Sequence, residues 1–195
     1  MASTQWCSQQ VSDSESLVFA AERVVAILDE YRIDAVVIGA VALAAYHYVR
    51  HTEDVDLGVN ADLAQMRALT VSLSKAGFSV ELREPDSQDP LGGVIDVRGD
   101  FGLLQIISFA DRFPAVIDDA VQASNLHVRE GSRLKLVPLP HLIALKLYAG
   151  GYKSKADIVE ILKCNPETDL DAVRKLCAGY RLPGLEELIA AALEK

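Results

Sequence analysis

Hydrophobic positions in the first third of the chain follow two different periods. Over residues 12–32 they recur every three or four positions, which predicts an amphipathic helix that Ser12 or Asp13 can cap. Residues 35–38 form a short β-branched run that ends at a glycine, which is typical of a buried strand. Residues 54–59 alternate acidic and apolar side chains, and this period of two predicts a strand with one polar face.

The remainder of the chain continues with short strands and then becomes helical. Two strand pairs are separated by glycine-containing turns, which predicts hairpins. The helical segment that starts at residue 138 is divided at Asn165-Pro166 and at Leu182-Pro183, because the residue before a proline disfavours helix. The predicted helices cover residues 41–49, 61–76, 109–123, 140–149, 153–164, 166–178 and 183–193, and the strands cover 78–83, 94–98, 103–107, 125–129 and 133–137. This order predicts an α+β fold, a mixed β-sheet flanked by helices, with a C-terminal helical bundle.

Composition divides the chain into three expected parts. Residues 1–11 are polar and lack apolar periodicity, which predicts a disordered leader, whereas residues 12–137 form the α+β domain and residues 138–195 the helical domain. The chain shows no signal-peptide pattern, and no apolar run approaches the ~20 residues that span a bilayer. The three cysteines are scattered and form no CxxC pair. We therefore expect a cytoplasmic protein with reduced thiols and no membrane partner.

The main chemical signal is the pair of aspartates in the alternating strand. Side chains two positions apart on a strand point to the same face, so Asp54 and Asp56 share one face while Val55 and Leu57 point into the core. Two adjacent carboxylates repel each other, and a hard divalent cation such as Mg²⁺ or Mn²⁺ would relieve that repulsion. The alternative is a half-exposed edge strand with two solvated aspartates, and an Asp-x-Asp motif alone does not decide between the two.

The residues before this strand have features expected of a phosphate site. Gly39 permits a tight turn from strand to helix, and the small Ala40 lets the backbone approach a ligand. The free N–H groups at the start of the following helix can bind anionic phosphate. The net charge of −9 disfavours a large nucleic-acid footprint, although four lysines over residues 146–163 can form a local basic patch. A solvated helix face is the alternative interpretation of these lysines.

Two separated motifs resemble one known superfamily. The first is GAVAL over residues 39–43 followed by RHTEDVDL over residues 50–57, and the second is PHLIALKLYAG over residues 140–150 followed by DIVEIL over residues 157–162. Together they resemble the nucleotidyltransferases related to DNA polymerase beta. The more specific resemblance is to the bacterial group that includes the abortive-infection toxins of type IV toxin–antitoxin systems. It covers roughly residues 36–162.

The resemblance implies a nucleotidyltransferase-type fold and a metal-dependent transfer of a nucleoside monophosphate from an NTP to an acceptor, with release of pyrophosphate. It implies that Asp54 and Asp56 hold the Mg²⁺ or Mn²⁺ ion and act in catalysis. The nucleotide contacts that it implies fall on Gly39, Ala40, Arg50, Thr52 and Lys146. Arg50 and Thr52 are also expected to brace the loop before the strand. Lys146, a flexible point charge suited to phosphate, belongs to the implied catalytic set as well.

The sequence departs from this superfamily at the third carboxylate. Relatives carry an acid on a later central strand, where this chain has Gln105. An amide cannot accept a proton at ordinary pH, so Gln105 cannot activate an attacking hydroxyl. Asp96 on the neighbouring hairpin strand is the candidate catalytic replacement. A four-residue turn over residues 99–102 places Asp96 opposite Gln105, a different turn pairs it with Leu103, and the sequence leaves both open.

Three functional hypotheses follow from these features. The first is an active nucleotidyltransferase whose acceptor is an RNA, a protein or a small molecule, including a toxin that would be paired with an antitoxin. The second is a catalytically impaired module that binds a nucleotide or a partner on the same fold, which Gln105 favours. The third is a small modifying enzyme, such as one that acts on antibiotics, because a net charge of −9 is compatible with a cationic substrate.

Overall fold

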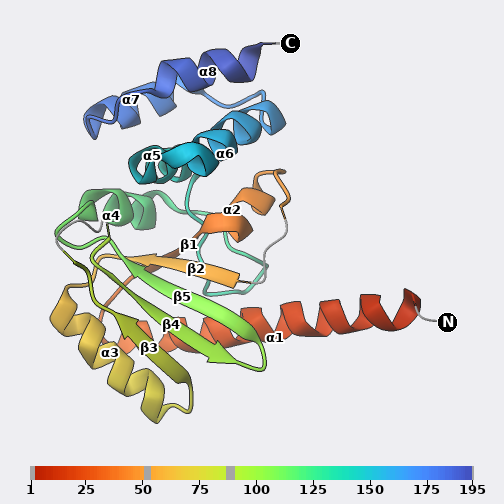
Figure 1. The fold of residues 1–195 in the computed structure, drawn as a ribbon, viewed down its shortest axis with the longest axis vertical. Helices are drawn as coiled ribbons and strands as arrows, with labels where there is room; N and C mark the ends of the chain where they lie inside the picture. The colour runs from red at the N-terminus through yellow and green to blue at the C-terminus, as the bar shows by residue number, and fades with distance from the viewer. Residues whose placement is uncertain (1–2, 51–53, 87–90, 195) are drawn as a thin grey trace.

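A central sheet with helices on both sides forms the core of the protein (Figure 1). The structure, a computed structural model, describes residues 3–50, 54–86 and 91–194, with side chains from residue 16 onward. The helices are α1 (Ser3–Glu30), α2 (Gly39–Ala45), α3 (Leu63–Lys75), α4 (Pro114–Ala123), α5 (Leu139–Ala149), α6 (Gly151–Cys164), α7 (Leu170–Gly179) and α8 (Leu185–Leu193). The strands are β1 (Ala35–Ile38), β2 (Asp54–Val59), β3 (Ser79–Arg83), β4 (Gly93–Gly99) and β5 (Gly102–Ser108).

The five strands lie in the order β1-β2-β5-β4-β3. β2 and β5 are parallel, and the other neighbouring pairs are antiparallel, so the sheet is mixed. The chain leaves β2, crosses through α3 to the far edge at β3, and returns by two antiparallel steps to place β5 beside β2. This return brings the β4–β5 hairpin next to the strand that carries the two aspartates.

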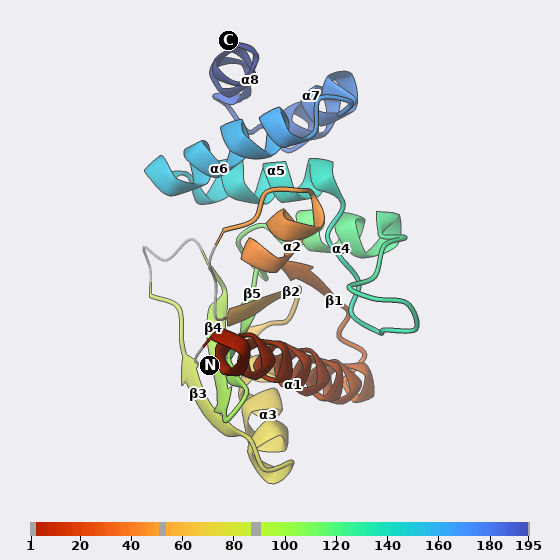
Figure 2. The ribbon, with the colours of Figure 1, turned by 90° about the vertical axis from the view of Figure 1, so that its right-hand side faces the viewer.

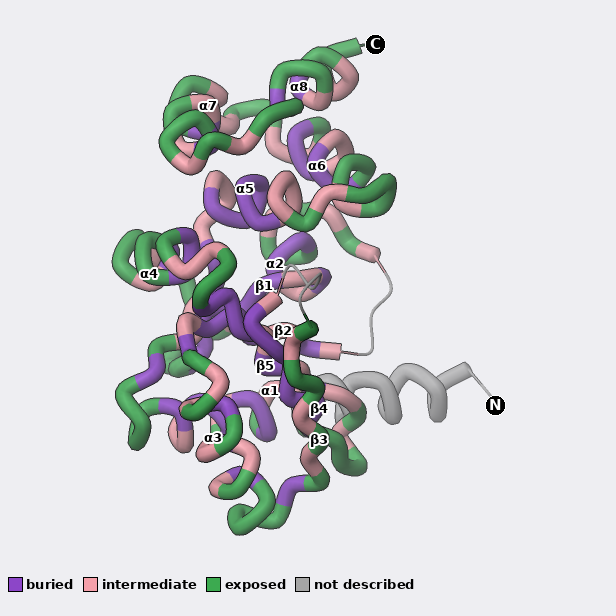
Figure 3. The backbone as a smooth tube through the Cα atoms, turned by 60° about the vertical axis from the view of Figure 1, so that its left-hand side comes forward, coloured by how far each residue is buried: buried purple, intermediate pink, exposed green. Residues whose placement is uncertain are grey.

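One face of the sheet is apolar and packs against α1 and α3. Val55, Leu57 and Leu104 on this face are at most 4% exposed, and α1 contacts β5 while α3 contacts β3 and β4. On the opposite face, α2 and α4 contact β1 and β2. Buried positions are concentrated in the sheet, α2 and α5, whereas α7 and α8 are mostly exposed or half-buried (Figure 3). The alternation read from the sequence therefore separates a core face from a functional face, as a period-two strand requires.

The C-terminal helices are joined to the sheet region through the end of α2. Figure 2 shows α2 between the strands and the α5–α6 pair. The Tyr46 hydroxyl donates to the backbone oxygen of Val137 at 2.9 Å, and Asn165 Nδ2 donates to the backbone oxygens of Tyr46 at 2.6 Å and Ile161 at 2.8 Å. These bonds satisfy polar groups where the chain turns between elements. The division into domains at residue 137 stays a prediction.

Several element boundaries differ from the sequence-based expectation, including the end of α2, at Ala45 rather than residue 49, and the start of α7, at Leu170 rather than residue 166. α1 begins at Ser3 rather than at Ser12 or Asp13, so its backbone is helical through most of the segment predicted to be a disordered leader. A polar segment can continue a helix because the backbone bonds are satisfied within it. α4 begins at Pro114 rather than Phe109, since proline suits the first helical position and the Phe109 N–H bonds to the Val59 oxygen, beyond the end of β5.

The predicted hairpin over residues 125–137 also differs from the expectation. It forms isolated bridges rather than regular strands, with Leu136 beside Val37 of β1 and Lys135 beside His127. The Val37 N–H donates to the Lys135 oxygen at 2.7 Å, and the Val137 N–H donates to the Val37 oxygen at 3.1 Å. The backbone here continues the edge of the sheet because β1 offers unpaired groups on that side.

The structure also bears on two sequence predictions, the lack of a membrane-spanning segment and the reduced state of the cysteines. Across the ranges that the structure describes, no helix combines the length and hydrophobicity that a bilayer crossing requires. Cys164 and Cys177 are free thiols, and burial raises the pKa of the Cys177 thiol to about 11. A buried thiol of this kind is a structural residue rather than a reactive one.

A reciprocal cap starts α3 and gives a test of local stability. The Asp62 side chain accepts from the Gln65 N–H at 2.8 Å, and the Gln65 side chain accepts from the Asp62 N–H at 2.9 Å. We expect Asp62→Ala to lower the free energy of unfolding by about 1 kcal/mol, because it leaves an N–H of the first turn unsatisfied. Urea unfolding measures this, and Asp62→Asn, which can still cap, should stay close to wild type.

Candidate nucleotide and metal site

The two aspartates stand at the start of β2 on the face opposite the core. Asp54 and Asp56 are both partly exposed, whereas Val55 between them is 4% exposed on the other face. Asp54 pairs with Leu103 of β5, and Asp56 pairs with Gln105. Residues paired across neighbouring strands share a face, so Gln105 lies in the same row as Asp56. The predicted strand and its polar face are confirmed.

Gly39 and Asp56 are in direct contact. Asp56 pairs with Ile38 at the end of β1, and the next residue, Gly39, has a φ of +67°. A Cβ built on Gly39 would lie 1.9 Å from Asp56 Oδ2. Glycine is therefore required here both by the left-handed backbone and by the carboxylate that packs against it. Ala40 follows at 3% exposure, so both small residues pack close to the aspartate strand.

Burial and charge shift the acidity of Asp56. Burial raises the pKa of Asp56 to about 6, and the adjacent Asp54 carboxylate adds to the rise. The positive charges of Lys146, Arg50 and Lys153 oppose the rise but do not cancel it. A carboxylate in this setting is unfavourable without a further cation, which is the condition that a bound divalent ion meets.

A second cluster faces the aspartates from the C-terminal helices. Asp157 of α6 is 3% exposed, and its Oδ2 accepts from Lys146 Nζ of α5 at 2.7 Å and lies 3.6 Å from Arg50 Nη1. Arg50 Nε is buried and has no hydrogen-bond partner among the described residues. Two cations thus share one carboxylate, which leaves the cluster with a positive charge beside the two aspartates.

The four lysines over residues 146–163 do not form one continuous patch. Lys146 donates a hydrogen bond to Asp157, and the positive charge of Lys153 lowers the pKa of Asp56. Lys163 instead pairs with Glu160 at 3.0 Å on an exposed part of α6. The interpretation as a solvated helix face holds for Lys163, while Lys146 and Lys153 belong to the site.

The structure places Asp96 directly opposite Gln105, the pairing that a turn over residues 99–102 predicts. Gln105 Nε2 donates to Asp96 Oδ1 at 2.7 Å, and Arg83 Nη2 and Arg98 Nη2 donate to its two oxygens at 2.9 and 3.2 Å. Burial tends to raise the pKa of Asp96, but the bonds from Gln105 and Arg83 and the two arginine charges hold it below its usual value. A carboxylate so stabilised is a weak base.

The site therefore gathers most, but not all, of the predicted residues. Gly39, Ala40, Asp54 and Asp56 lie together, with Arg50 and Lys146 beside them, whereas Thr52 lies outside the described residues. Asp96 lies on β4, two strand spacings from Asp56 with β5 between them, and its catalytic role stays a prediction. Within the described ranges, no group of three or more His, Cys, Asp or Glu side chains is arranged to hold a metal.

Sequence reasoning missed the two arginines that hold Asp96. Arg98 lies two residues after Asp96 on the same strand, and Arg83 lies on the neighbouring strand β3. The period of two would have placed Arg98 on the face of Asp96, but only the β3–β4 register brings in Arg83.

Comparisons with known proteins agree with this architecture at the level of fold. No family model matches the chain, and no curated protein matches its sequence. The solution structure of the antibiotic-resistance factor ANT(2'')-Ia is similar with a TM-score of 0.53 and 19% identity, over 87% of this chain and 92% of that one. A crystal structure of ANT(2'')-Ia in complex with adenylyl-2''-tobramycin is similar with a TM-score of 0.52 and 18% identity, over 85% of this chain and 97% of that one.

A third similar structure is an antigenic nucleotidyltransferase-like protein from Paracoccidioides brasiliensis. It has a TM-score of 0.51 and 20% identity, over 92% of this chain and 93% of that one. The chain has the nucleotidyltransferase fold. The expectation of an α+β nucleotidyltransferase-type sheet with flanking helices is thereby confirmed.

The raised pKa of Asp56 predicts a pH-dependent stability. Because the folded state binds this proton more tightly than the unfolded state, stability should fall as pH rises from about 4 to about 6. We expect Asp56→Asn to be more stable than wild type at pH 7 by on the order of 3 kcal/mol, and the difference to vanish below pH 4. Urea unfolding in a chelator at both pH values measures it, and a constant difference would contradict it.

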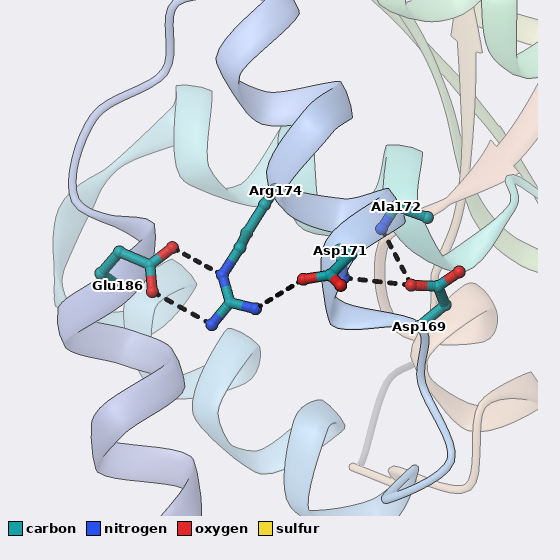
Figure 4. Close-up of polar contacts among 5 residues, drawn as sticks. All are labelled: Asp169, Asp171, Ala172, Arg174 and Glu186. Carbon is teal, nitrogen blue, oxygen red and sulfur yellow. Dashed lines mark hydrogen bonds and ion pairs between the residues drawn. The ribbon is translucent and has the colours of Figure 1, made fainter.

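The burial of Asp157 predicts that truncation of its side chain strongly lowers the free energy of unfolding. Asp157→Ala leaves Lys146 and Arg50 without their carboxylate, and we expect it to lower the free energy of unfolding by about 3–5 kcal/mol. Asp171 is the matched control: it binds Arg174 at 3.0 Å on the surface of α7 (Figure 4), with its side chain 94% exposed. Asp171→Ala should cost less than about 1 kcal/mol. Equal losses in urea unfolding would contradict the burial argument.

Proposed function

We propose that the protein transfers a nucleoside monophosphate from an NTP to an acceptor hydroxyl, with release of pyrophosphate. The observation that carries the proposal is the convergence of Asp54 and Asp56 on one strand face with three cations, Lys146, Arg50 and Lys153, whose charges reach Asp56. A fold shared with nucleotidyltransferases makes this chemistry the first hypothesis to test. Oppositely charged groups around one point suit a cation–phosphate complex better than either ion alone.

The residues present fit a divalent metal carried by the nucleotide. Mg²⁺ is commonly bound through one or two protein carboxylates together with substrate phosphates, so two aspartates suffice. The raised pKa of Asp56 supports this fit, because a cation would stabilise the ionised pair. When bound, Mg²⁺ or Mn²⁺ would neutralise charge on the phosphates and stabilise the attacking and leaving oxygens.

The chain's own cations have the placement expected of phosphate ligands. Arg50 keeps a buried Nε donor without a described partner, and a phosphate oxygen would satisfy it. Lys146 is held by Asp157 at 2.7 Å, so its ammonium is already fixed near enough to lower the pKa of Asp56, and little further ordering is needed when the nucleotide binds. Gly39 and Ala40 are small enough for the backbone turn to pack directly beside Asp56.

The attacking hydroxyl lacks an obvious base in this arrangement. Gln105 cannot take a proton, and Asp96 is stabilised in its ionised form by Gln105, Arg83 and Arg98. This observation favours a second candidate function, a module that binds a nucleotide without transferring it. The two candidates share the metal and phosphate site and differ only in turnover.

The class of acceptor and the biological role are more specific parts of the proposal. The sequence motifs favour the bacterial toxin group, which would give the protein an antitoxin partner and an RNA or protein acceptor. The structure of ANT(2'')-Ia with adenylyl-2''-tobramycin makes a small molecule the alternative acceptor. An assay with each α-labelled NTP and with RNA, protein and small-molecule acceptors separates these proposals.

The proposed function predicts a specific loss in two isosteric variants. Asp54→Asn and Asp56→Asn should each weaken Mg²⁺-dependent NTP binding at least about tenfold, because each removes one charged metal ligand. Calorimetric titration with Mg²⁺–NTP measures this, and label transfer should disappear in the same variants. Glu81→Gln is the control, since Glu81 is an exposed acid on the same sheet face beyond Asp96.

Two outcomes decide between the candidates. Unchanged Mg²⁺-dependent affinity in both aspartate variants would rule out the metal site. Binding that needs Asp56 but gives no transfer with any acceptor would favour the binding module, and Gln105→Asp would then be expected to raise transfer above the wild-type level by restoring a proton acceptor.

A further inference from the structure

A buried carboxylate on the functional face of the sheet holds two half-exposed arginines. Asp96 is 6% exposed, whereas the side chains of Arg83 and Arg98 are 52% and 56% exposed. Arg83 donates to Asp96 Oδ1 and Arg98 to Oδ2, while Gln105 completes the set. We call Arg83, Asp96 and Arg98 the arginine cluster. Its carboxylate fixes the two guanidinium groups, which would otherwise be flexible surface side chains.

Both arginines keep donors for a ligand. A guanidinium has five N–H donors in a planar fork, and each arginine uses Nη2 for the bond to Asp96. The cluster carries two positive charges against one negative charge. Fixed guanidinium groups with spare donors are well suited to phosphate oxygens, which they bind by paired hydrogen bonds. The exposed Glu81 pairs with Asp96 in the same row, so its carboxylate offsets part of this positive charge.

The cluster lies at a defined position relative to the aspartates. Asp56, Gln105 and Asp96 occupy one row across β2, β5 and β4, and Arg98 stands in the row of Asp54. Two strand spacings separate Asp56 from Asp96, about 10 Å. In Figure 1 α1 passes behind β4 and β5, and on the opposite face Ser79, Glu81 and Arg83 are exposed. A ligand at the aspartates can therefore extend over β5 and β4 to the arginines.

We propose that the arginine cluster binds the phosphate backbone of a single-stranded RNA acceptor whose reacting end lies at Asp54 and Asp56. The proposal rests on the proposed transfer function for the identity of that end. The arginines lie about 10 Å from Asp56 across the sheet, too far to contact the terminal nucleotide alone, so they would contact backbone phosphates upstream of the terminal hydroxyl. Because the contacts are to phosphate, they position the strand without reading its sequence. A local contact of this kind is compatible with a net charge of −9.

The test measures RNA binding without NTP, so it is independent of the transfer reaction. A fluorescein-labelled single-stranded RNA of about 10 nucleotides is titrated with wild type, Arg83→Gln, Arg98→Gln and the double variant at several salt concentrations. We expect the double variant to bind about tenfold more weakly, and the slope of log affinity against log salt to shrink by about 0.7 for each arginine removed. Each single variant leaves Asp96 one arginine, which preserves the fold if the double variant does not fold.

Arg67→Gln is the matched control. Arg67 is similarly exposed, at 59%, and is also ion-paired, with Glu84 at 2.8 Å, but it belongs to α3, which packs near the other face of the sheet. RNA binding should stay at the wild-type level in this variant. Equal losses in Arg67→Gln and the cluster variants, or wild-type affinity in both single variants, would overturn the proposal.

Further measurements distinguish RNA binding by the arginine cluster from general anion binding and from the proposed nucleotide binding. A poly-glutamate peptide that binds through the arginines while RNA does not would overturn the RNA assignment. A separate titration of wild type with Mg²⁺–NTP tests the proposed function, so failure of nucleotide binding and failure of the arginine cluster give different results. Arg83→Lys with Arg98→Lys should retain the salt slope and lose part of the affinity, because lysine keeps the charge but not the paired hydrogen bonds.

Discussion

Asp56 occupies an electrostatically unfavourable position, and the surrounding elements are arranged around it. Its carboxylate is largely buried, stands two residues from Asp54 and rests against the backbone of Gly39. Burial and like charge both disfavour ionisation, which is why the pKa of Asp56 rises to about 6. Three consequences follow: residue 39 must be glycine, the positive charges of Lys146 and Arg50 are needed near the pair, and a bound cation would stabilise its ionised form.

The cations come from a part of the chain far from the aspartates in sequence. Lys146 and Asp157 belong to α5 and α6, while Arg50 belongs to the segment after α2, and Asp157 connects them. Hydrogen bonds of Asn165 and Tyr46 fix the end of α2 against these helices. The C-terminal helices therefore do more than cover apolar surface, because they supply charge that partly offsets the aspartate pair. A helical bundle that only covered the sheet would not need a buried ion pair, whose desolvation is costly.

Gln105 determines how the acid on the neighbouring strand β4 is bound. With a carboxylate at position 105, Asp96 would face a like charge across the β4–β5 ladder, which destabilises a directly opposed pair. With glutamine, the amide N–H₂ donates to Asp96, and the carboxylate becomes the anchor for Arg83 and Arg98. Gln105 and the two fixed arginines are thus linked through one carboxylate, that of Asp96. If the proposed transfer takes place, this arrangement would hold an anionic acceptor rather than deprotonate it.

The sequence by itself determined the features that depend on local periodicity. The alternation over β2 gave the shared face of Asp54 and Asp56, the β-branched run gave β1, and the glycine-bounded turn placed Asp96 opposite Gln105 as one of two registers. These depend on the pleat of a strand and on turn geometry, which nearby residues fix. The boundaries of α1 and α4 were less well predicted, because helix ends depend on capping and on the strand that precedes them.

Only the tertiary structure decided which distant side chains meet. The crossover that places β5 beside β2 brings Gln105 into the row of Asp56, and the β3–β4 register brings Arg83 to Asp96. Nothing in the spacing along the chain indicates that Lys146, Asp157 and Arg50 form one cluster, or that Asp56 packs against Gly39 closely enough to exclude a Cβ. Side-chain periodicity assigns a residue to a face, but charge, burial and hydrogen bonding arise from the packing of elements that the sequence holds far apart.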